Sequence, residues 1–365
     1  MKKTTINRLL AVCLFFVCTV PVAAQKAAYL PDGVTEEKLK PLLTTPPQYR
    51  AVKTNQAIEV DGFANEAIWQ EIPFTSNFRD IAGGPTGNKS ALKLCWDEQY
   101  LYVFAQLEQP QLWASLTKKD TAVFMDNALE FFIDMDGDMQ QYIEFQINAF
   151  GTTWDLMLSK AYRDGGKGDS DFEFPGLKKA VRLRGTLNQP GDIDEGWDVE
   201  LAIPLAPRNG QIARMNFSHV NWKLDVVNGV YQKQKDASGR IAQPHYIVWS
   251  PQGRVDLHMP ERWGYVLFSE EAGPAAFISA ETLEMQQSLW KYYYLQRDHR
   301  EQHKQYASGM EELRKKYPGL NWKDAKQVQL LKDPTGFVLV GKERKSGRKW
   351  RLDAEGRLQQ IKISN

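Results

Sequence analysis

The amino-acid sequence predicts a mainly β protein: an antiparallel, jelly-roll-like β-sandwich with an appended C-terminal helix and a short β-hairpin. Between Ala51 and about Ser269, short runs of alternating apolar and polar residues are separated by clusters of Gly, Pro, Asn and Asp, which is typical of many short paired strands. Hydrophobic residues make up 42% of the 365 positions, enough for a sizeable core. After Pro274 the pattern changes to that of a helix.

The first residues have the pattern of an export signal. A charged start, an apolar run over residues 9–20 and the small-residue site Val22-Ala23-Ala24 predict a signal peptide over residues 1–24. No later segment approaches about 18 uncharged apolar residues, so we expect no transmembrane segment and a periplasmic or extracellular protein. Four prolines over residues 25–50 predict a lead-in segment laid over the surface.

Charge and cysteine content exclude several classes of protein. Lys and Arg (46) nearly balance Asp and Glu (45), and no basic run is interleaved with aromatic residues, so nucleic acid is not an expected partner. Cys95 is the only thiol after the predicted signal peptide, which excludes an internal disulfide. Its place beside Leu94 and Trp96 in a strand pattern predicts an inert core residue.

Two consecutive runs place polar groups on one face of the predicted sheet. Over residues 129–134, alternation directs Glu130 to the face opposite the apolar residues. Over residues 142–148, it directs Glu144, Gln146 and Asn148 in the same way. Carboxylate and amide groups gathered on an open sheet face are suited to hydrogen-bonding a sugar.

The remaining elements complete the predicted sandwich over residues 51–270. Alternation over residues 197–203 and 222–227 predicts antiparallel strands with one buried face each, with Trp197 and Trp222 in the core. Residues 271–365 form a predicted C-terminal module. Ser279 caps a helix from Ala280 to about Tyr306 whose apolar residues could dock on the sandwich, and strands follow over residues 336–340, 349–352 and 358–363.

An acidic turn follows the first polar strand. Asp134, Asp136 and Asp138 place hard oxygen donors at alternate positions around Gly137, a pattern that suits Ca²⁺. Asp-Gly is also a common hairpin turn, and no Glu stands twelve residues on, as an EF-hand loop requires. Calcium and a plain turn are therefore both open interpretations.

An ordered series of short motifs spans about 220 residues. It comprises Val60-Asp61-Gly62 with Ala67-Ile68-Trp69, Trp96-Asp97 with Tyr100-Leu101-Tyr102-Val103, Asp126 with residues 129–134, Phe145 with Asn148 and Gly151, Trp249-Ser250, and Pro260-Glu261-Arg262-Trp263-Gly264. In this series the chain resembles carbohydrate-binding module family 9, especially its secreted, stand-alone bacterial members. The resemblance implies a β-sandwich that binds sugars on its concave face, often with structural calcium, and no catalytic machinery.

The resemblance also implies roles for individual residues. Glu130 matches a carboxylate that hydrogen-bonds sugar hydroxyls, whereas Gln146 stands where sugar-binding members carry an arginine. The two tryptophans that clamp a sugar in such members are replaced by Val123-Phe124 and Leu257-His258. The expected carbohydrate-binding residues are Glu130, Gln146, Asn148, Phe124, Trp113, His258 and Arg262, with Trp154 as a further candidate for stacking.

Two other functions remain open at this stage. Glu130 and Glu144 could face one cleft, and a glycoside hydrolase requires a pair of carboxylates. Similar sandwiches bind haem through a Met and a His on facing strands. The candidates here are Met125, Met157, Met215 and His219.

The sequence therefore predicts an exported, non-catalytic protein that captures oligo- or polysaccharide in support of carbohydrate catabolism. Its partners would be that saccharide and other components of a glycan-degradation system, which the C-terminal module could dock. Apart from Ca²⁺ at the acidic turn, we expect no cofactor.

Overall fold

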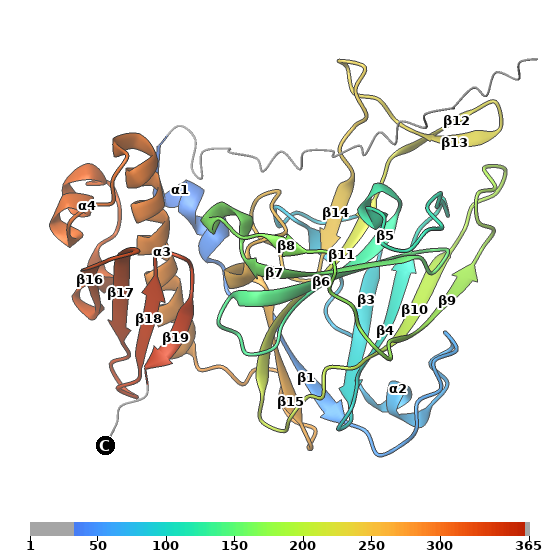
Figure 1. Ribbon diagram of the computed structural model, residues 1–365, viewed down its shortest axis with the longest axis horizontal. Helices are drawn as coiled ribbons and strands as arrows, with labels where there is room; N and C mark the ends of the chain where they lie inside the picture. Colours follow the sequence, from blue (N-terminus) through green and yellow to red (C-terminus); the bar gives the residue numbers. More distant parts are fainter. Residues whose placement is uncertain (1–32, 362–365) are drawn as a thin grey trace, which may run out of the picture.

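A computed structural model describes residues 33–361 (Figure 1). The predicted signal peptide, the first part of the lead-in segment and the last four residues lie outside the described residues. Within residues 33–361, no helix is long and apolar enough to cross a membrane.

One large sheet builds the sandwich. Within the described residues it has thirteen strands, in the order β8-β7-β6-β5-β11-β15-β1-β3-β4-β10-β9, with β14 and β2 paired outside this path. The strands are β1 (Gln48–Lys53), β2 (Arg79–Asp80), β3 (Ser90–Trp96), β4 (Leu101–Glu108), β5 (Ala128–Asp134), β6 (Gln140–Asn148), β7 (Thr153–Lys160), β8 (Gly168–Asp169), β9 (Lys178–Arg184), β10 (Gly196–Ile203), β11 (Ile212–Asn221), β14 (His245–Val248) and β15 (Gly264–Ser269).

A hairpin, two short helices and several 3₁₀ turns connect or flank the strands of this sheet. A separate hairpin of β12 (Leu224–Val227) and β13 (Val230–Lys233) projects beyond β14 in Figure 1. The others are the helices α1 (Glu36–Leu39) and α2 (Ala67–Glu71) and the 3₁₀ turns η1 (Lys40–Leu43), η2 (Val123–Met125), η3 (Tyr162–Asp164) and η4 (Pro260–Arg262).

The sheet folds over a single apolar core that takes side chains from both ends of the strand order. Leu92 on β3 and Trp197 on β10 belong to the same cluster as Phe131 on β5 and Phe217 on β11. The ring centroids of Phe131 lie 5.5 Å from Phe145 and 5.6 Å from Phe217. The predicted sandwich and the predicted inward faces of these strands are therefore confirmed.

The predicted strand over residues 222–227 is not part of the sandwich, because Leu224–Val227 form β12 of the separate hairpin, where Val226 is 50% exposed.

The other strands differ from the prediction in two ways. First, β1 pairs in parallel with both β15 and β3, so the sheet is not wholly antiparallel. Because more than 200 residues separate β1 from β15, no hairpin forces them to be antiparallel. Second, β10 is buried on both faces, since α2 and its neighbours cover its outer side. Glu200 there accepts hydrogen bonds from Trp69 Nε1 and from two backbone N–H groups, which offsets its burial.

The tryptophans and the cysteine that the sequence assigned to the core are buried. Trp96, Trp197 and Trp222 are at most 8% exposed. Cys95 is fully buried, and burial raises the pKa of its thiol, which favours the unreactive protonated form.

The C-terminal module has its own apolar core. Its long helix α3 (Ala280–His303) begins at the Ser279 cap, as predicted, and is followed by α4 (Met310–Lys316) and η5 (Lys323–Gln327). The strands that follow are β16 (Val328–Asp333), β17 (Gly336–Lys342), β18 (Lys349–Asp353) and β19 (Leu358–Ile361), which form a four-stranded sheet. The sequence did not predict β16, whose burial pattern shows little alternation.

Helix α3 packs mainly on this small sheet, not on the sandwich as expected. Leu289 and Trp290 lie in one cluster with Phe337 and Leu339 of β17. The same cluster takes Leu39 and Leu42 from α1 and η1, so the end of the lead-in segment is a folded part of this core. A sheet with one apolar face needs a partner to cover that face, and α3 supplies the apolar side chains that do so.

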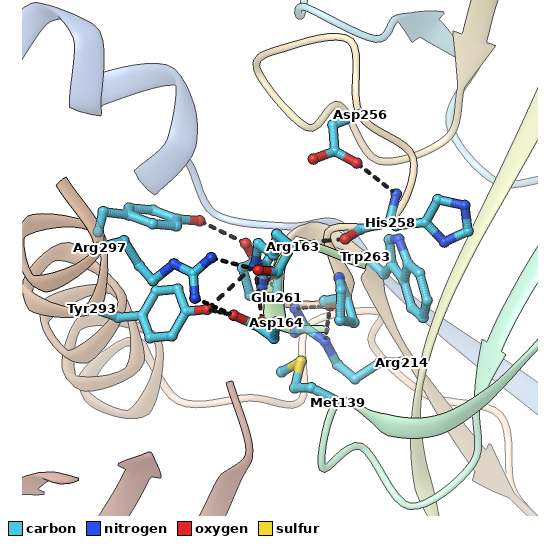
Figure 2. A network of polar contacts seen from close by, with 12 residues as sticks. Met139, Arg163, Asp164, Arg214, Asp256, His258, Glu261, Trp263, Tyr293 and Arg297 are labelled. Atoms are coloured by element: carbon cyan, nitrogen blue, oxygen red, sulfur yellow. Dashed lines mark hydrogen bonds and ion pairs between the residues drawn. The ribbon is translucent and has the colours of Figure 1, made fainter. Parts of the chain in front are cut away.

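Polar and charged side chains join the module to the sandwich, as Figure 2 shows. Arg163 of η3 forms ion pairs with Asp164, 3.2 Å away, and with Glu261 of η4, 2.8 Å away. From α3, Arg297 lies 3.0 Å from Asp164, and the hydroxyl of Tyr293 donates to the same carboxylate. Because these charges are largely buried, each of them must keep an oppositely charged partner for the module and the sandwich to stay in contact.

We predict that Gly264→Ala destabilises the protein by about 1–3 kcal/mol, the cost of overpacking a core. A Cβ at Gly264 would lie 2.3 Å from the Trp249 ring, which stacks on Phe217 in the core. Urea denaturation followed by tryptophan fluorescence measures the change. Gly319→Ala is the matched control, because nothing lies within 4 Å of the added carbon. An unchanged midpoint in Gly264→Ala would contradict the packing described.

Candidate functional site

The polar residues predicted on one sheet face do lie together, because the strand register aligns them. Glu130 on β5 is paired with Gln146 on β6 and with Ser218 on β11. Gln146 is in turn paired with Trp154 on β7. Residues paired across neighbouring strands project to the same face. Glu144 lies two residues from Gln146 on this face, opposite Phe132.

The Gln146 amide is the centre of the group. Its Nε2 donates to Glu144 Oε1 over 2.7 Å and to Glu130 Oε1 over 3.1 Å, so one nitrogen bridges the two carboxyl groups. Its Oε1 accepts a hydrogen bond of 2.8 Å from the backbone N–H of Phe124. That backbone donor determines which end of the amide is oxygen. Every hydrogen-bonding position of Gln146 except one lone pair is therefore used.

The face is far less open than the sequence suggested. Glu130 is 2% exposed, Glu144 6% and Gln146 fully buried. Neither Glu130 Oε2 nor Ser218 Oγ has a hydrogen-bond partner within the described residues. Strand alternation correctly predicted which side of the sheet these groups face. It did not predict that loops and aromatic rings cover that side.

Burial disfavours the ionised form of both carboxyl groups. Desolvation raises the pKa of Glu130 well above its ordinary value, and the charge of Glu144 raises it further, while Ser218 lowers it. Desolvation also raises the pKa of Glu144, against the opposing effects of His258 and Gln146. Two buried carboxyl groups that share one amide donor thus titrate as a coupled pair.

Half-buried aromatic rings flank these carboxyl groups. Phe124 and Trp154 pack with ring centroids 5.9 Å apart and an interplanar angle of 35°. Tyr246 on β14 is near enough for both carboxylates to raise the pKa of its phenol, after burial, the larger cause. No hydrogen bond of the Tyr246 hydroxyl is found within the described residues. Together the three rings offer apolar faces and one available hydroxyl beside buried hydrogen-bonding groups.

His258 closes another side of the group. Its Nε2 lies 3.7 Å from Glu144 Oε2, and its Nδ1 lies 2.9 Å from the hydroxyl of Tyr142. The Tyr162 ring packs edge-on against it at 4.6 Å. Burial lowers the pKa of the imidazole, Glu144 raises it, and Arg163 lowers it again. His258, which the sequence predicted as a sugar-binding residue, therefore lies beside the carboxyl pair.

Asn148, by contrast, has no capacity left for a ligand. Its Nδ2 donates to Leu116 O over 2.8 Å and to Asp126 Oδ2 over 3.0 Å. Its Oδ1 accepts from the backbone N–H groups of Phe150 and Thr152, each over 3.0 Å. With two donors and two acceptor positions filled, Asn148 holds the surrounding loops, and the structure contradicts its assignment to the binding face.

Arg262 and Trp113 are also engaged elsewhere. Arg262 is 3% exposed and donates to the backbone and hydroxyl oxygens of Thr44 and to Pro251 O, so its donors are directed at the lead-in segment. Trp113 packs in an apolar cluster at the edge of the site, with Lys233 Nζ 5.5 Å from its ring centroid. Arg262 is therefore removed from the binding set, and Trp113 is at most a peripheral contact.

The acidic turn forms the β5–β6 hairpin. Asp134 accepts hydrogen bonds from the backbone N–H groups of Gly137 and Met139, as a turn requires, and Arg357 Nε lies 3.4 Å from Asp138 Oδ2. Even so, one oxygen from each of the three carboxylates lies within 4.8 Å of the others. The carboxylates are Asp134, Asp136 and Asp138. The donor set therefore fits a hard cation as well as the turn.

The residues considered for haem do not form a haem site. His219 lies inside the core, with Nδ1 3.0 Å from Ser90 Oγ and Nε2 3.1 Å from Gln109 Oε1. Gln109 Oε1 also accepts from Trp197 Nε1. Both ring nitrogens are thus used, and burial lowers the pKa of His219 to about 3, which keeps the imidazole neutral. An axial iron ligand would need one of these nitrogens free.

A family model confirms what the motif series indicated. The model of the carbohydrate family 9 binding domain-like family matches residues 60–270, more than half of the chain. The chain belongs to this family. The matched segment contains β2 to β15 and all of the site residues described above.

Other proteins share parts of this family 9-like chain. Endo-1,4-beta-xylanase C of Paenibacillus barcinonensis is 29% identical over 147 residues, which is 40% of this chain and 11% of the xylanase. Endo-1,4-beta-xylanase A of Thermoanaerobacterium saccharolyticum is 27% identical over 157 residues, 42% of this chain and 12% of the enzyme. The chain thus spans about a tenth of the length of these relatives.

One match among solved structures is a module of the same family. It is a family 9 carbohydrate-binding module from Caldicellulosiruptor kristjanssonii in complex with glucose, 18% identical, with a TM-score of 0.40. The match covers 62% of this chain and 98% of that module.

Sequence reasoning placed Glu144 on the polar sheet face but left it out of the expected binding residues, and it did not select Tyr246. Glu144 shares the alternation of Gln146, so the strand pattern already placed it on the same face. Tyr246 lies more than 100 residues after Glu144, in a strand of four residues. Nothing in its own segment indicates that this strand, β14, pairs with β11. A long-range strand pairing of this kind leaves no local signal.

We predict that Glu130→Gln stabilises the protein at neutral pH. Because the pKa of Glu130 is raised, the folded protein keeps a proton that the unfolded chain loses above about 4.5, so the free energy of unfolding falls as pH rises from that value. The amide cannot ionise and removes this loss. We expect the melting temperature to rise by about 2–4 °C for each kcal/mol gained, and the difference from wild type to vanish toward acidic pH.

Thermal melts across this pH range check the expectation, with Glu71→Gln as the control because Glu71 is exposed at the end of α2. A lower melting temperature for Glu130→Gln at every pH would show that the ionised carboxylate stabilises the fold.

Proposed function

We propose that the protein binds carbohydrate without catalysis, at the face formed by β5, β6, β7 and β14. Membership of the family over residues 60–270 carries this proposal. The geometry supports it, since half-buried rings at Phe124, Trp154 and Tyr246 stand beside the buried carboxyl groups of Glu130 and Glu144. Sugar-binding sites combine apolar ring faces with a few convergent polar groups in this manner.

The ligand would be an oligo- or polysaccharide captured in support of carbohydrate catabolism. A family member binds glucose and cellotriose, and the two relatives are xylanases, so cello- and xylo-oligosaccharides are the first ligands to test. The signal-like start of the sequence supports an exported protein, periplasmic or extracellular. The C-terminal module would then face other components of a glycan-degradation system.

The hydrolase alternative finds less support in the geometry. A glycosidase needs one carboxyl group as acid and the other as nucleophile or base, separately placed around the glycosidic bond. Here one amide nitrogen donates to both Glu130 and Glu144. Release of reducing sugar from a bound oligosaccharide, lost in Glu144→Gln, would overturn the non-catalytic proposal.

We predict that Trp154→Ala reduces the affinity for the bound glycan at least about tenfold, which corresponds to about 1.4 kcal/mol, because it removes one ring of the flanking pair. A glycan array with residues 25–365, followed by calorimetry on the best ligand, measures this.

Phe63→Ala is the matched control, because Phe63 is an exposed aromatic residue, 54% accessible, outside the site. Equal loss of binding in both variants, or no binding by a folded wild-type protein across a broad array, would contradict the proposed site or function.

We also propose that Asp134, Asp136 and Asp138 hold Ca²⁺, which would neutralise three adjacent carboxylates in the β5–β6 turn. Addition of Ca²⁺ at 100 times its dissociation constant is then expected to stabilise the fold by about 2.7 kcal/mol.

Thermal melts with calcium and with a chelator, on wild type and Asp136→Asn, test this. Identical melting temperatures in both conditions would mean that the carboxylates serve the turn alone.

A further inference from the structure

Within residues 33–361, the carboxyl pair has no Lys or Arg partner. Among the described residues, no Lys or Arg forms an ion pair with Glu130 or Glu144, and the nearest basic side chain is His258, whose Nε2 lies 3.7 Å from Glu144 Oε2. Elsewhere in this protein, buried carboxylates do have such partners. Glu261 and Asp164, for example, are both paired with Arg163. Within the described residues, no Lys or Arg therefore neutralises these carboxyl groups when they ionise.

The residue at position 146 is the reason that no positive charge lies between the two carboxyl groups. Gln146 bridges Glu130 and Glu144 through an uncharged amide. The resemblance to family 9 modules implies an arginine at this position. An arginine would have neutralised one carboxylate and donated to it in a bidentate manner. The amide satisfies one oxygen of each carboxylate and supplies no charge.

Two buried polar atoms on this face are unpartnered. Ser218 is close enough to Glu130 to lower the pKa of its carboxyl, but within the described residues neither Glu130 Oε2 nor Ser218 Oγ has any other hydrogen-bond partner, although Glu130 is 2% exposed and Ser218 is fully buried. Since β5 and β11 pair these residues directly, their unpartnered atoms lie on the same face. A buried carboxylate oxygen and a buried hydroxyl without partners are costly, and a donor from a ligand would remove that cost.

The surrounding rings add attraction for a cation. Phe124, Trp154 and Tyr246 line one side of the pair, and the face of an aromatic ring attracts positive charge. None of these rings is covered by a Lys or Arg side chain among the described contacts. By comparison, Lys233 lies 3.7 Å from the ring centroid of Trp222 at the edge of the site.

We propose that this site binds a sugar that carries a free amino group, whose ammonium donates to Glu130 and Glu144. This inference rests on the proposed carbohydrate-binding function and names the class of sugar. The sugar hydroxyls would be met by Tyr246 and Ser218, and its apolar ring face by Trp154. A neutral sugar can fill the same space, but it leaves the paired carboxyl groups without a counter-charge.

The experiment compares three tetrasaccharides with the same β-1,4 glucose backbone that differ only at C2. They are fully deacetylated chitosan tetramer, its fully N-acetylated form and cellotetraose, and their affinities for residues 25–365 are measured by calorimetry in slightly acidic buffer. We expect the amine to bind about tenfold or more tightly than the other two, the gain from charge-assisted hydrogen bonds. The preference should weaken at high salt.

Variants separate a specific site from general attraction between charges. Glu130→Gln and Glu144→Gln should each reduce the ratio of the affinity for the amine to the affinity for cellotetraose to about threefold or less. Glu71→Gln, which removes an exposed carboxylate elsewhere, should leave the preference unchanged.

A second measurement detects the proton that is released when the sugar binds. Because burial raises the pKa of Glu130, an ammonium that stabilises its ionised form favours release of a proton to the buffer, so the binding enthalpy should change with the ionisation enthalpy of the buffer. Equal affinity for the amine and for cellotetraose would overturn the amino-sugar inference and leave carbohydrate binding intact. No binding of any tetrasaccharide or array glycan would overturn both.

Discussion

The organisation of the site depends on one buried amide. Gln146 donates to both Glu130 and Glu144 and accepts from the backbone of Phe124, so a single side chain determines the spacing of the carboxyl groups and the position of η2. Because Phe124 packs on Trp154, the same amide also orients the aromatic pair. An amide can do this because it offers two donors and an acceptor in one plane. A charged side chain at this position would have bound one carboxylate and changed the electrostatics of the whole face.

A second buried polar group connects this site to the rest of the chain. Arg163 pairs with Glu261 and also donates to the backbone oxygen of His258, 3.4 Å away. His258 in turn lies beside Glu144. Glu261 also accepts a hydrogen bond from Tyr294 of α3, so the C-terminal module contacts the segment that carries His258. The described part of the C-terminal module therefore helps to support the site through polar contacts, although residues 271–361 supply none of the groups proposed to contact a ligand.

Much of the site could be predicted from the sequence, but its accessibility could not. Strand alternation is a local property, and it correctly placed Glu130 and Gln146 on one face. Whether that face meets solvent depends on loops and on β14, which come from distant parts of the chain. Asn148 illustrates the limit. It has the right alternation, yet its four hydrogen bonds go to Leu116, Asp126, Phe150 and Thr152, and no pattern within the strand reveals them.

The sequence by itself determined the β-sandwich, its inward faces, the helix beginning at Ser279 and the family to which the chain belongs, because periodicity, capping and ordered motifs are written in neighbouring residues. Only the tertiary structure decided that β1 pairs in parallel, that α3 covers its own small sheet, and that Glu130 and Glu144 are bridged, buried and without a Lys or Arg partner within residues 33–361. Pairing over long separations and desolvation arise only when distant segments meet, so no local pattern encodes them.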